Sequence, residues 1–333
     1  MRLWLRAFVG FYPPHDESAR TLDPVAKFLF SARSVILVIS AQAAIIAGLL
    51  AVSAGRFNAL AFALVLIGFV TAHAISNLSN DYFGYLRGHD TADSPRMRYT
   101  MHPIASGVLD PRTLAAGLAI LAVIGTAIVI YFWTVRGPAA LVFSLAGLAL
   151  LYLYDAAPKP LKSLGLGEAA AFLVWGPLMV GGGFFVITGT LSADAFLASL
   201  PYGLGVMSIL VGKHIDQAGF DREHHQHTLP VLLGDARARA LTRAVIVGMY
   251  AIIALLIAMG RLTPFAAVAA LALPRAWKAV SVLSQPRPDV PPPGYVGWPL
   301  WYHRVCLVHN RLFGWAYIAG LAVGALADIF TKR

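Results

Sequence analysis

Long apolar stretches dominate this sequence and constrain its fold more than any other feature. Nine of them meet or approach the length of about 20 residues that a helix needs to cross the hydrocarbon core of a bilayer. They run over residues 34–54, 58–79, 113–134, 138–154, 168–188, 194–212, 240–260, 262–282 and 311–330. The fourth is short, and the eighth contains Pro264 and Pro274. The pattern predicts an all-α, multi-pass membrane bundle of about nine transmembrane helices.

The composition indicates that lipid is the main solvent of this chain. Of its 333 residues, 58% are hydrophobic and 13% are charged, whereas an ordinary soluble domain carries about 25% charged residues. These values exclude a disordered chain, a disulfide scaffold and a typical cytosolic enzyme. Cys306 is the single cysteine, so an internal disulfide is excluded as well.

The basic residues are distributed unevenly between the two ends of the predicted spans. Most of the 26 lysines and arginines fall in the N-terminal arm and in every second connection after it. The positive-inside rule therefore predicts a cytoplasmic N-terminus and a C-terminus outside. The net charge of +10 then reflects orientation and contact with membrane lipid, and nucleic acid is not an expected partner. Longer cytoplasmic loops are the alternative explanation for the polar character of that side.

The same patterns divide the chain into regions. Residues 1–33 are expected to form a cytoplasmic and interfacial N-terminal arm, and residues 34–333 a single transmembrane domain. Within that domain, the segment 284–310 is expected to lie at the cytoplasmic interface as a cover over the polar side.

Polar residues gather where the second span ends. Asn77, Asn80 and Asp81 stand at i, i+3 and i+4, so a helix places them on one face. Asp90 and Asp93 follow in the loop. Carboxylate and amide oxygens are the ligands that Mg²⁺ prefers, so this cluster is a candidate metal site. Helix capping and ordinary loop polarity are the alternative interpretation.

A second acidic cluster follows the sixth span. Asp216 and Asp221 lie at its polar end, with Lys213 and Arg222 beside them. Two carboxylate clusters that face one cavity would suit two metal ions bridged by a diphosphate, with the basic side chains neutralising further charge. Three histidines come next: His224, His225 and His227. A solvated polar loop is the preferred interpretation of these histidines over a transition-metal site.

A proline-rich connection separates the fourth and fifth spans. It carries Lys159 and Lys162, and Glu168 opens the fifth span, where the helix dipole favours an acidic side chain. Tyr152 and Tyr154 precede the connection. They are either aromatic residues of the membrane interface or the entrance of a site for an aromatic substrate.

Taken together, the three segments resemble the UbiA superfamily of intramembrane aromatic prenyltransferases, most of all its menaquinone branch, the 1,4-dihydroxy-2-naphthoate polyprenyltransferases. The similarity spans roughly residues 75–235. The matching positions are 80–81 and 88–90 in the first motif, 158–168 in the connection, and 221–222 with 228–229 in the second motif. The connection matches without a gap the pattern P-x-P-L-K-x-x-G-L-G-E of that branch, which makes it the most specific of the three.

The sequence departs from the family pattern at several positions. Gly84 stands where the family usually has the second aspartate of its first motif. The aspartate spacing of the second motif would use Gln217, whereas the aspartate here is Asp216. His225 and Gln226 replace the usual Gly-Lys pair. The missing aspartate would weaken one expected Mg²⁺ site, and the missing lysine would weaken one expected contact with the diphosphate.

The resemblance implies a Mg²⁺-dependent enzyme that transfers a polyprenyl group from a polyprenyl diphosphate to a dihydroxynaphthoate-like aromatic acceptor, with decarboxylation. It implies a location in the cytoplasmic (inner) membrane, with the active site facing the cytoplasm. The implied catalytic and metal-binding carboxylates are Asp81, Asp90, Asp216 and Asp221, with Asn77 and Asn80 as further metal ligands. The implied diphosphate contacts are Arg87, Lys159, Lys162, Lys213 and Arg222, and the residues lining the aromatic substrate are Tyr82 and Tyr154.

Two other functions stay open at this point. One is prenyl transfer or cyclisation with a different acceptor. The other is a non-catalytic bundle that binds or transports lipid, for which Gly84 and the replaced Gly-Lys pair are the best support. A transporter would need polar groups near the bilayer midplane, and His73 is nearly the only ionisable side chain far from a span end.

Overall fold

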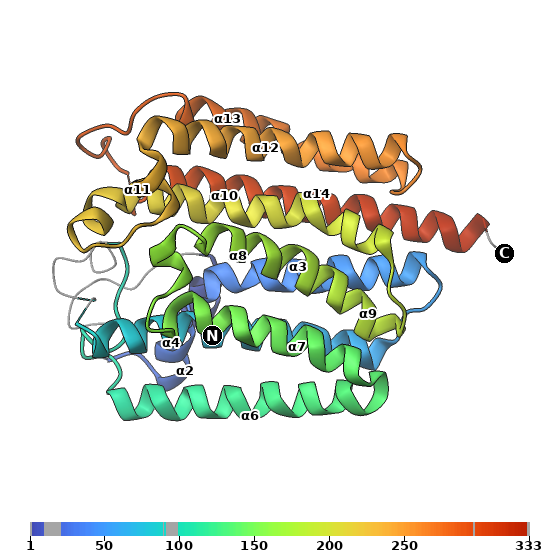
Figure 1. Ribbon diagram of the computed structural model, residues 1–333, viewed down its shortest axis with the longest axis horizontal. Helices are drawn as coiled ribbons and strands as arrows, with labels where there is room; N and C mark the ends of the chain where they lie inside the picture. Colours follow the sequence, from blue (N-terminus) through green and yellow to red (C-terminus); the bar gives the residue numbers. More distant parts are fainter. Residues whose placement is uncertain (1, 10–20, 89, 91–98, 296, 332–333) are drawn as a thin grey trace.

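The protein forms a bundle of long, roughly aligned helices (Figure 1). The computed structural model describes residues 2–9, 21–88, 90, 99–295 and 297–331, and these residues form helices and connections with no strand among them. The all-α, multi-pass prediction is therefore confirmed. Asp93 lies outside the described residues, so the structure says nothing about it.

In the part of the chain that the structure describes, eight helical segments are long and apolar enough to cross a membrane. They are α3 (Ser34–Ser53), α4 (Ala59–Leu86), α6 (Pro111–Arg136), α8–η4–α9 (Gly167–Thr188), α10 (Ala193–Glu223), α12 (Asp235–Ala258), η5–α13 (Pro264–Leu283) and α14 (Tyr302–Thr331). The fourth predicted span, residues 138–154, forms a shorter apolar helix, Pro138–Tyr154. Helix α7 (Pro138–Leu151) makes up most of it. The count of nine spans and the sides of the two termini stay predictions.

Side-chain caps fix where several helices begin. The carboxylate of Asp110 accepts from the backbone N–H of Thr113 at 3.0 Å, and Pro111 occupies the first turn of α6, where its missing N–H costs nothing. Asn58 caps α4 and Ser192 caps α10 in the same way. These residues also mark the starts of apolar stretches in the sequence, which is why the predicted starts lie close to the observed ones.

Two helices extend well beyond the apolar stretches that predicted them. The predicted spans end at residues 79 and 212, but α4 continues to Leu86 and α10 to Glu223. Polar side chains do not stop a helix, and α4 ends only before Gly88, which has a φ of 68°. Both acidic clusters therefore begin on the last turns of helices, at the end of the bundle opposite the C-terminus (Figure 1).

The fifth span changes its helical geometry where it passes α10. Between α8 (Gly167–Leu173) and α9 (Gly182–Thr188), residues Val174–Gly181 form a π-helix that contains Pro177, which has no backbone N–H to donate. A Cβ atom at Gly203 of α10 would lie 2.9 Å from the carbonyl oxygen of Phe172. Glycine at this crossing lets the two backbones approach closely.

Polar links join the central helices inside the apolar bundle. The hydroxyl of Tyr202 on α10 donates to the carbonyl of Ile39 at 2.6 Å and to the amide oxygen of Gln42 at 3.0 Å, both on α3. The amide nitrogen of Gln42 donates to the carbonyl of Arg311 on α14 at 3.0 Å. These buried bonds fix the relative positions of three helices that support the polar end.

The segment predicted to cover the polar side is divided between a loop and a helix. Helix α13 ends at Leu283 and α14 begins at Tyr302, so residues 302–310 belong to α14. In the loop, the Arg287 guanidinium donates to the carbonyls of Asp216 at 2.9 Å and Pro299 at 3.3 Å. The loop is thus tied to the polar end of α10. In the N-terminal arm, α1 (Arg2–Val9) and α2 (Pro24–Ser31) precede the first span.

Candidate active site

A cavity of about 530 Å³ opens at the end of the bundle where both acidic clusters lie. Its walls come from the ends of α4 and α10, the loops that follow them, and the connection between the fourth and fifth spans. Nine of the residues predicted from sequence line it: Asn80, Asp81, Arg87, Asp90, Tyr154, Lys159, Lys162, Lys213 and Asp221. Four other predicted residues are described but are not part of the lining: Asn77, Tyr82, Asp216 and Arg222.

The α4 wall is fixed to the start of α3. Asp81 is 1% exposed, and its carboxylate accepts from the guanidinium of Arg33, which also lines the cavity. Arg33 adopts a left-handed backbone conformation, with a φ of 56°, between α2 and α3. Asn77 donates to the carbonyl of Ala32 at 3.0 Å, so its amide holds this junction and is turned away from the cavity.

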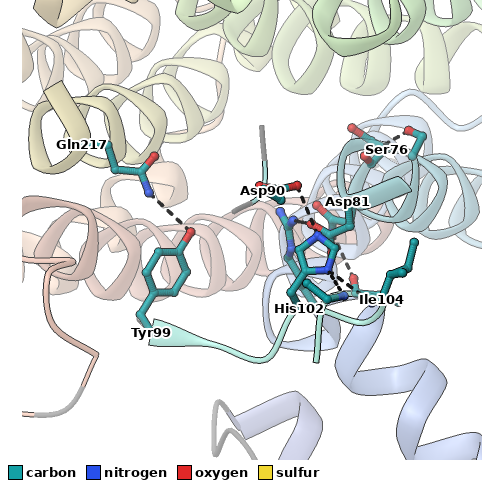
Figure 2. A network of polar contacts seen from close by, with 12 residues as sticks. Ser76, Asp81, Asp90, Tyr99, His102, Ile104 and Gln217 are labelled. Atoms are coloured by element: carbon teal, nitrogen blue, oxygen red, sulfur yellow. Dashed lines mark hydrogen bonds and ion pairs between the residues drawn. The ribbon is translucent and has the colours of Figure 1, made fainter. Parts of the chain in front are cut away.

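Asp90 occupies the space that a side chain at position 84 would need. A Cβ atom placed on Gly84 would collide with the carboxylate of Asp90. His102, which is fully buried, contacts that carboxylate through Nε2 at 3.2 Å (Figure 2). The Nδ1 atom of His102 accepts from the backbone N–H groups of Ile104 at 3.2 Å and Ala105 at 3.1 Å. Because Nδ1 is an acceptor, Nε2 carries the proton and donates it to Asp90.

The α4 wall fits a divalent cation. One ligand atom from each of Asp81, Asp90 and His102 lies within 4.8 Å of the others, the only such group of three found among the described residues. Carboxylate oxygens suit Mg²⁺. His102 donates a hydrogen bond from the atom that points to this position, so it orients Asp90 and is not itself a ligand in this tautomer. The ligands that fit are therefore Asp81 and Asp90, with Asn80 on the same wall.

The α10 wall has a different composition. The carboxylate of Asp221 accepts from the hydroxyl of Thr228 at 3.2 Å, and Lys213 and Lys162 lie close enough to interact with it electrostatically. Gln217 lines the cavity one turn earlier, and its amide nitrogen lies 3.5 Å from the hydroxyl of Tyr99 (Figure 2). This wall therefore presents one carboxylate among several basic side chains.

Asp216 serves the fold at this end of the bundle. Its two carboxylate oxygens accept from the backbone N–H groups of Tyr302 at 3.0 Å and His303 at 2.9 Å. These are the first residues of α14, so Asp216 satisfies donors that a helix start leaves without partners. The carboxylate is turned toward α14 and away from the cavity.

The other predicted residues outside the lining have ordinary environments. Tyr82 packs among apolar side chains that include Leu78 and Leu114, edge-on to the ring of Phe83 at 5.6 Å. Arg222 is exposed at the end of α10. The three histidines of the following loop line the cavity, and His224 stacks on Phe220 with ring centroids 3.8 Å apart. Within the described part of the chain they do not form a group with metal-ligand spacing.

Several residues in or beside the cavity are not predicted as site residues from the sequence. Arg33 precedes the first span, where nothing in the sequence links it to Asp81. His102 lies in a loop without a recognisable motif. His214, 4% exposed on α10, contacts Glu168 through Nδ1 at 2.7 Å. Of these residues, only Glu168 could have been identified from the sequence, because it is the last residue of the matched segment 158–168.

The fold and the cavity together define a multi-pass membrane protein whose polar site combines carboxylates with many basic side chains. The chain belongs to the UbiA prenyltransferase family, whose model matches residues 41–295, and it is a membrane prenyltransferase. It is 26% identical to the 1,4-dihydroxy-2-naphthoate octaprenyltransferase of Bacillus subtilis, over 68% of this chain and 71% of that protein. It is 29% identical to the enzyme of that name from Mycobacterium leprae, over 65% of this chain and 72% of that protein.

Solved structures share the fold. A UbiA homologue from Archaeoglobus fulgidus, bound to GPP and Mg²⁺, superposes with a TM-score of 0.58 at 15% identity. The superposition covers 89% of this chain and 99% of that one. At this identity the similarity supports the arrangement of helices, and the roles of individual residues rest on the geometry of this chain.

Proposed function

We propose that this protein transfers a polyprenyl group from a polyprenyl diphosphate to an aromatic acceptor within the membrane, with Mg²⁺ as cofactor. The acceptor is of the dihydroxynaphthoate kind, and the product belongs to quinone biosynthesis of the menaquinone type. The names of the relatives from Bacillus subtilis and Mycobacterium leprae support this choice of acceptor. The observation that carries the proposal is the pairing of Asp81 and Asp90 with the basic residues of one cavity.

The residues of the cavity have separate tasks in this reaction. Asp81 and Asp90, with Asn80, would hold Mg²⁺, and the bound ion would supply the positive charge that makes the diphosphate a good leaving group. Basic side chains bind the remaining phosphate oxygens and stabilise the departing pyrophosphate. They are Arg87, Lys159, Lys162 and Lys213. Tyr154 lines the same cavity, where its ring shields the allylic cation that forms when the diphosphate leaves.

The proposed metal set is smaller than the sequence suggests. Asp216 and Asn77 do not line the cavity and hold the start of α14 and the junction of α2 and α3 instead, so we leave both out. Among the described residues, Asp221 is the one carboxylate of the α10 wall, beside Lys213 and Lys162. There the basic side chains supply positive charge that a second metal ion would otherwise supply. Arg222 and Tyr82 are not part of this mechanism.

The proposed location is the cytoplasmic (inner) membrane, with the cavity on the cytoplasmic side. The basic residues that line the cavity, Arg33, Arg87, Lys159, Lys162 and Lys213, support this orientation through the positive-inside rule. Residues 1–33 then form a cytoplasmic arm, residues 34–333 the transmembrane domain, and the 284–301 loop a cover at the interface.

The test uses the full-length protein in lipid nanodiscs with Mg²⁺, a polyprenyl diphosphate and 1,4-dihydroxy-2-naphthoate. We expect pyrophosphate release that requires both substrates, and a prenylated product by mass analysis. Asp81→Asn is expected to abolish both signals, and Asp194→Asn, on an exposed ion pair with Arg261, is the matched control. Pyrophosphate release with another ring acceptor but not this one would reassign the acceptor. Absence of release with every ring acceptor would overturn the proposal.

A further inference from the structure

A buried carboxylate and a buried histidine form a pair in the wall of the cavity. Glu168 is 0% exposed at the start of α8, and its Oε1 lies 2.7 Å from Nδ1 of His214 on α10. His214 is also one of the residues that line the cavity, and the Nδ1 edge of its ring is directed to Glu168. The function proposed above uses neither residue, although burying a carboxylate is costly unless it is paired.

The pair fixes which nitrogen of the imidazole carries the proton. Glu168 stands in the first turn of α8, where the helix dipole favours an ionised carboxylate. An ionised carboxylate only accepts hydrogen bonds, so Nδ1 of His214 carries the proton. In the neutral ring this places the single proton on Nδ1 and leaves Nε2 of His214 with a lone pair.

The charged and titratable groups around His214 come from several elements. Glu168 approaches from α8, and Lys213 and Asp221 lie on α10 with it. His303 of α14 is also within electrostatic range. The carboxylate of Asp221 is directed to the hydroxyl of Thr228. Glu168 is the hydrogen-bond partner that the structure gives to the His214 ring.

The lone pair on Nε2 of His214 can bind only some of the groups that the proposed reaction brings into the cavity. Diphosphate oxygens only accept hydrogen bonds from donors, so they do not bind an acceptor nitrogen. Mg²⁺ prefers oxygen ligands over imidazole. An aromatic hydroxyl group is a donor and matches Nε2 directly. His102 is the opposite case, because its Nε2 carries the proton and donates to Asp90.

We propose that Nε2 of His214 binds a hydroxyl group of the aromatic acceptor, and that Glu168 holds the imidazole in the tautomer and orientation for this contact. The inference rests on the proposed function for the presence of a hydroxylated aromatic compound in the cavity. An aromatic surface is close at hand, because a Cβ atom at Gly167, next to Glu168, would lie 3.1 Å from the ring of Tyr154. The acceptor ring then packs on Tyr154 while its hydroxyl group contacts His214.

The test compares two ligands on full-length protein in nanodiscs. The probes are 1,4-dihydroxy-2-naphthoate and its O-methyl ethers, which keep the ring but lose a hydroxyl donor. Wild-type protein is expected to bind the dihydroxy compound about tenfold more tightly than one of the ethers, as expected for one hydrogen bond to a buried group. In His214→Ala this preference is expected to disappear, because the acceptor nitrogen is gone.

Two further variants separate this contact from a general effect on folding. His214→Gln places an amide oxygen near the position of Nε2 and is expected to retain part of the preference. Glu168→Gln removes the charge that fixes the tautomer and is expected to weaken it. Glu223→Gln, at the exposed end of α10, is the matched control and is expected to bind like wild type. In turnover assays, His214→Ala is expected to raise KM for the acceptor about tenfold while KM for the prenyl diphosphate stays unchanged.

The outcomes distinguish this inference from the proposed function. Equal preference for the dihydroxy compound in wild type and His214→Ala would overturn the inference, even if prenyl transfer proceeds. If wild type binds both ligands equally, the inference fails without reference to any variant. If the preference depends on His214 but no prenylated product forms, the binding site stands and the proposed reaction fails.

Discussion

The ends of α4 and α10 carry related acidic motifs, and each motif lacks one carboxylate of the family pattern. At α4, position 84 is glycine, and the carboxylate of Asp90 from the following loop fills the space. At α10, position 217 is glutamine, and the neighbouring Asp216 caps α14. One wall of the cavity therefore regains its second carboxylate and the other does not.

Helix geometry explains why the outcomes differ. Successive residues of an α-helix point about 100° apart, so a shift of one position from 217 to 216 turns the carboxylate from the cavity to α14. Asp90 follows the end of α4 and is free of this constraint. It reaches back over Gly84, where His102 holds it. A residue from a loop can place its carboxylate where a helix lacks one, whereas the neighbouring residue on the same helix points in another direction.

The largest expected effect is a difference in metal binding between the two walls. Asp81→Asn is expected to lower the affinity for Mn²⁺, used as a spectroscopic substitute for Mg²⁺, by about 100-fold or more, because it removes a ligand. Asp221→Asn is expected to change it much less. Electron paramagnetic resonance on the full-length protein gives the affinities and the number of bound ions. Equal losses for the two variants would show that the walls are equivalent.

A second set of variants tests the replacement at Gly84. Gly84→Ala is expected to displace the Asp90 carboxylate and to weaken Mn²⁺ binding about tenfold. Asp90→Ala is expected to weaken it at least as much, and the double variant Gly84→Asp with Asp90→Ala is expected to recover most of the loss. His102→Ala is expected to have a smaller effect, since it removes only the donor that orients Asp90. Failure of the double variant to improve on Asp90→Ala would contradict the shared position.

For Asp216 on α10 we expect the opposite of the result for Asp81 and Asp90: a loss of stability without a loss of metal affinity. Asp216→Ala is expected to destabilise the fold by about 1 kcal/mol through loss of the cap on α14, with Mn²⁺ affinity unchanged. The thermal midpoint in detergent and the Mn²⁺ titration check the two parts separately. If Mn²⁺ affinity fell while the stability stayed constant, Asp216 would be a metal ligand in the cavity and not a cap on α14.

The sequence predicted the bundle well because its signals are local. Apolar stretches determine the helices, and Asp110 or Asn58 mark where helices begin. Nine of the thirteen predicted site residues also line the cavity, because the ends of two helices and one connection are expected to meet at the same side of a membrane. Asp81, Asp90 and Lys162 are examples.

The remaining site residues depend on contacts between segments far apart in the chain. Arg33 meets Asp81 across 48 positions, and His214 meets Glu168 across 46. The sequence predicts Asp216 as a metal ligand because an aspartate at the polar end of a span is expected to face the cavity. Only the packing of α14 against α10 reveals that its carboxylate has another partner. Spacing alone did not settle this, since Gln217 and Asp216 differ by one position.

The smallest expected effect comes from a cap that lies away from the cavity. At the start of α6, the hydroxyl and backbone N–H of Thr113 donate to Asp110 and hold the pKa of its carboxyl below the usual value of 3.8. Because the pKa is lowered in the folded protein, the stabilisation is present above about pH 4 and is lost as the pH falls through the lowered pKa. Asp110→Ala is therefore expected to reduce the thermal midpoint slightly at pH 7 and to flatten its decline in acid.

Asp110 is exposed and its cap is screened by solvent, whereas Asp216 is buried. If Asp110→Ala lowered the midpoint as much as Asp216→Ala, the contribution of burial to the α14 cap would be refuted, and Asp216 would resemble any surface cap.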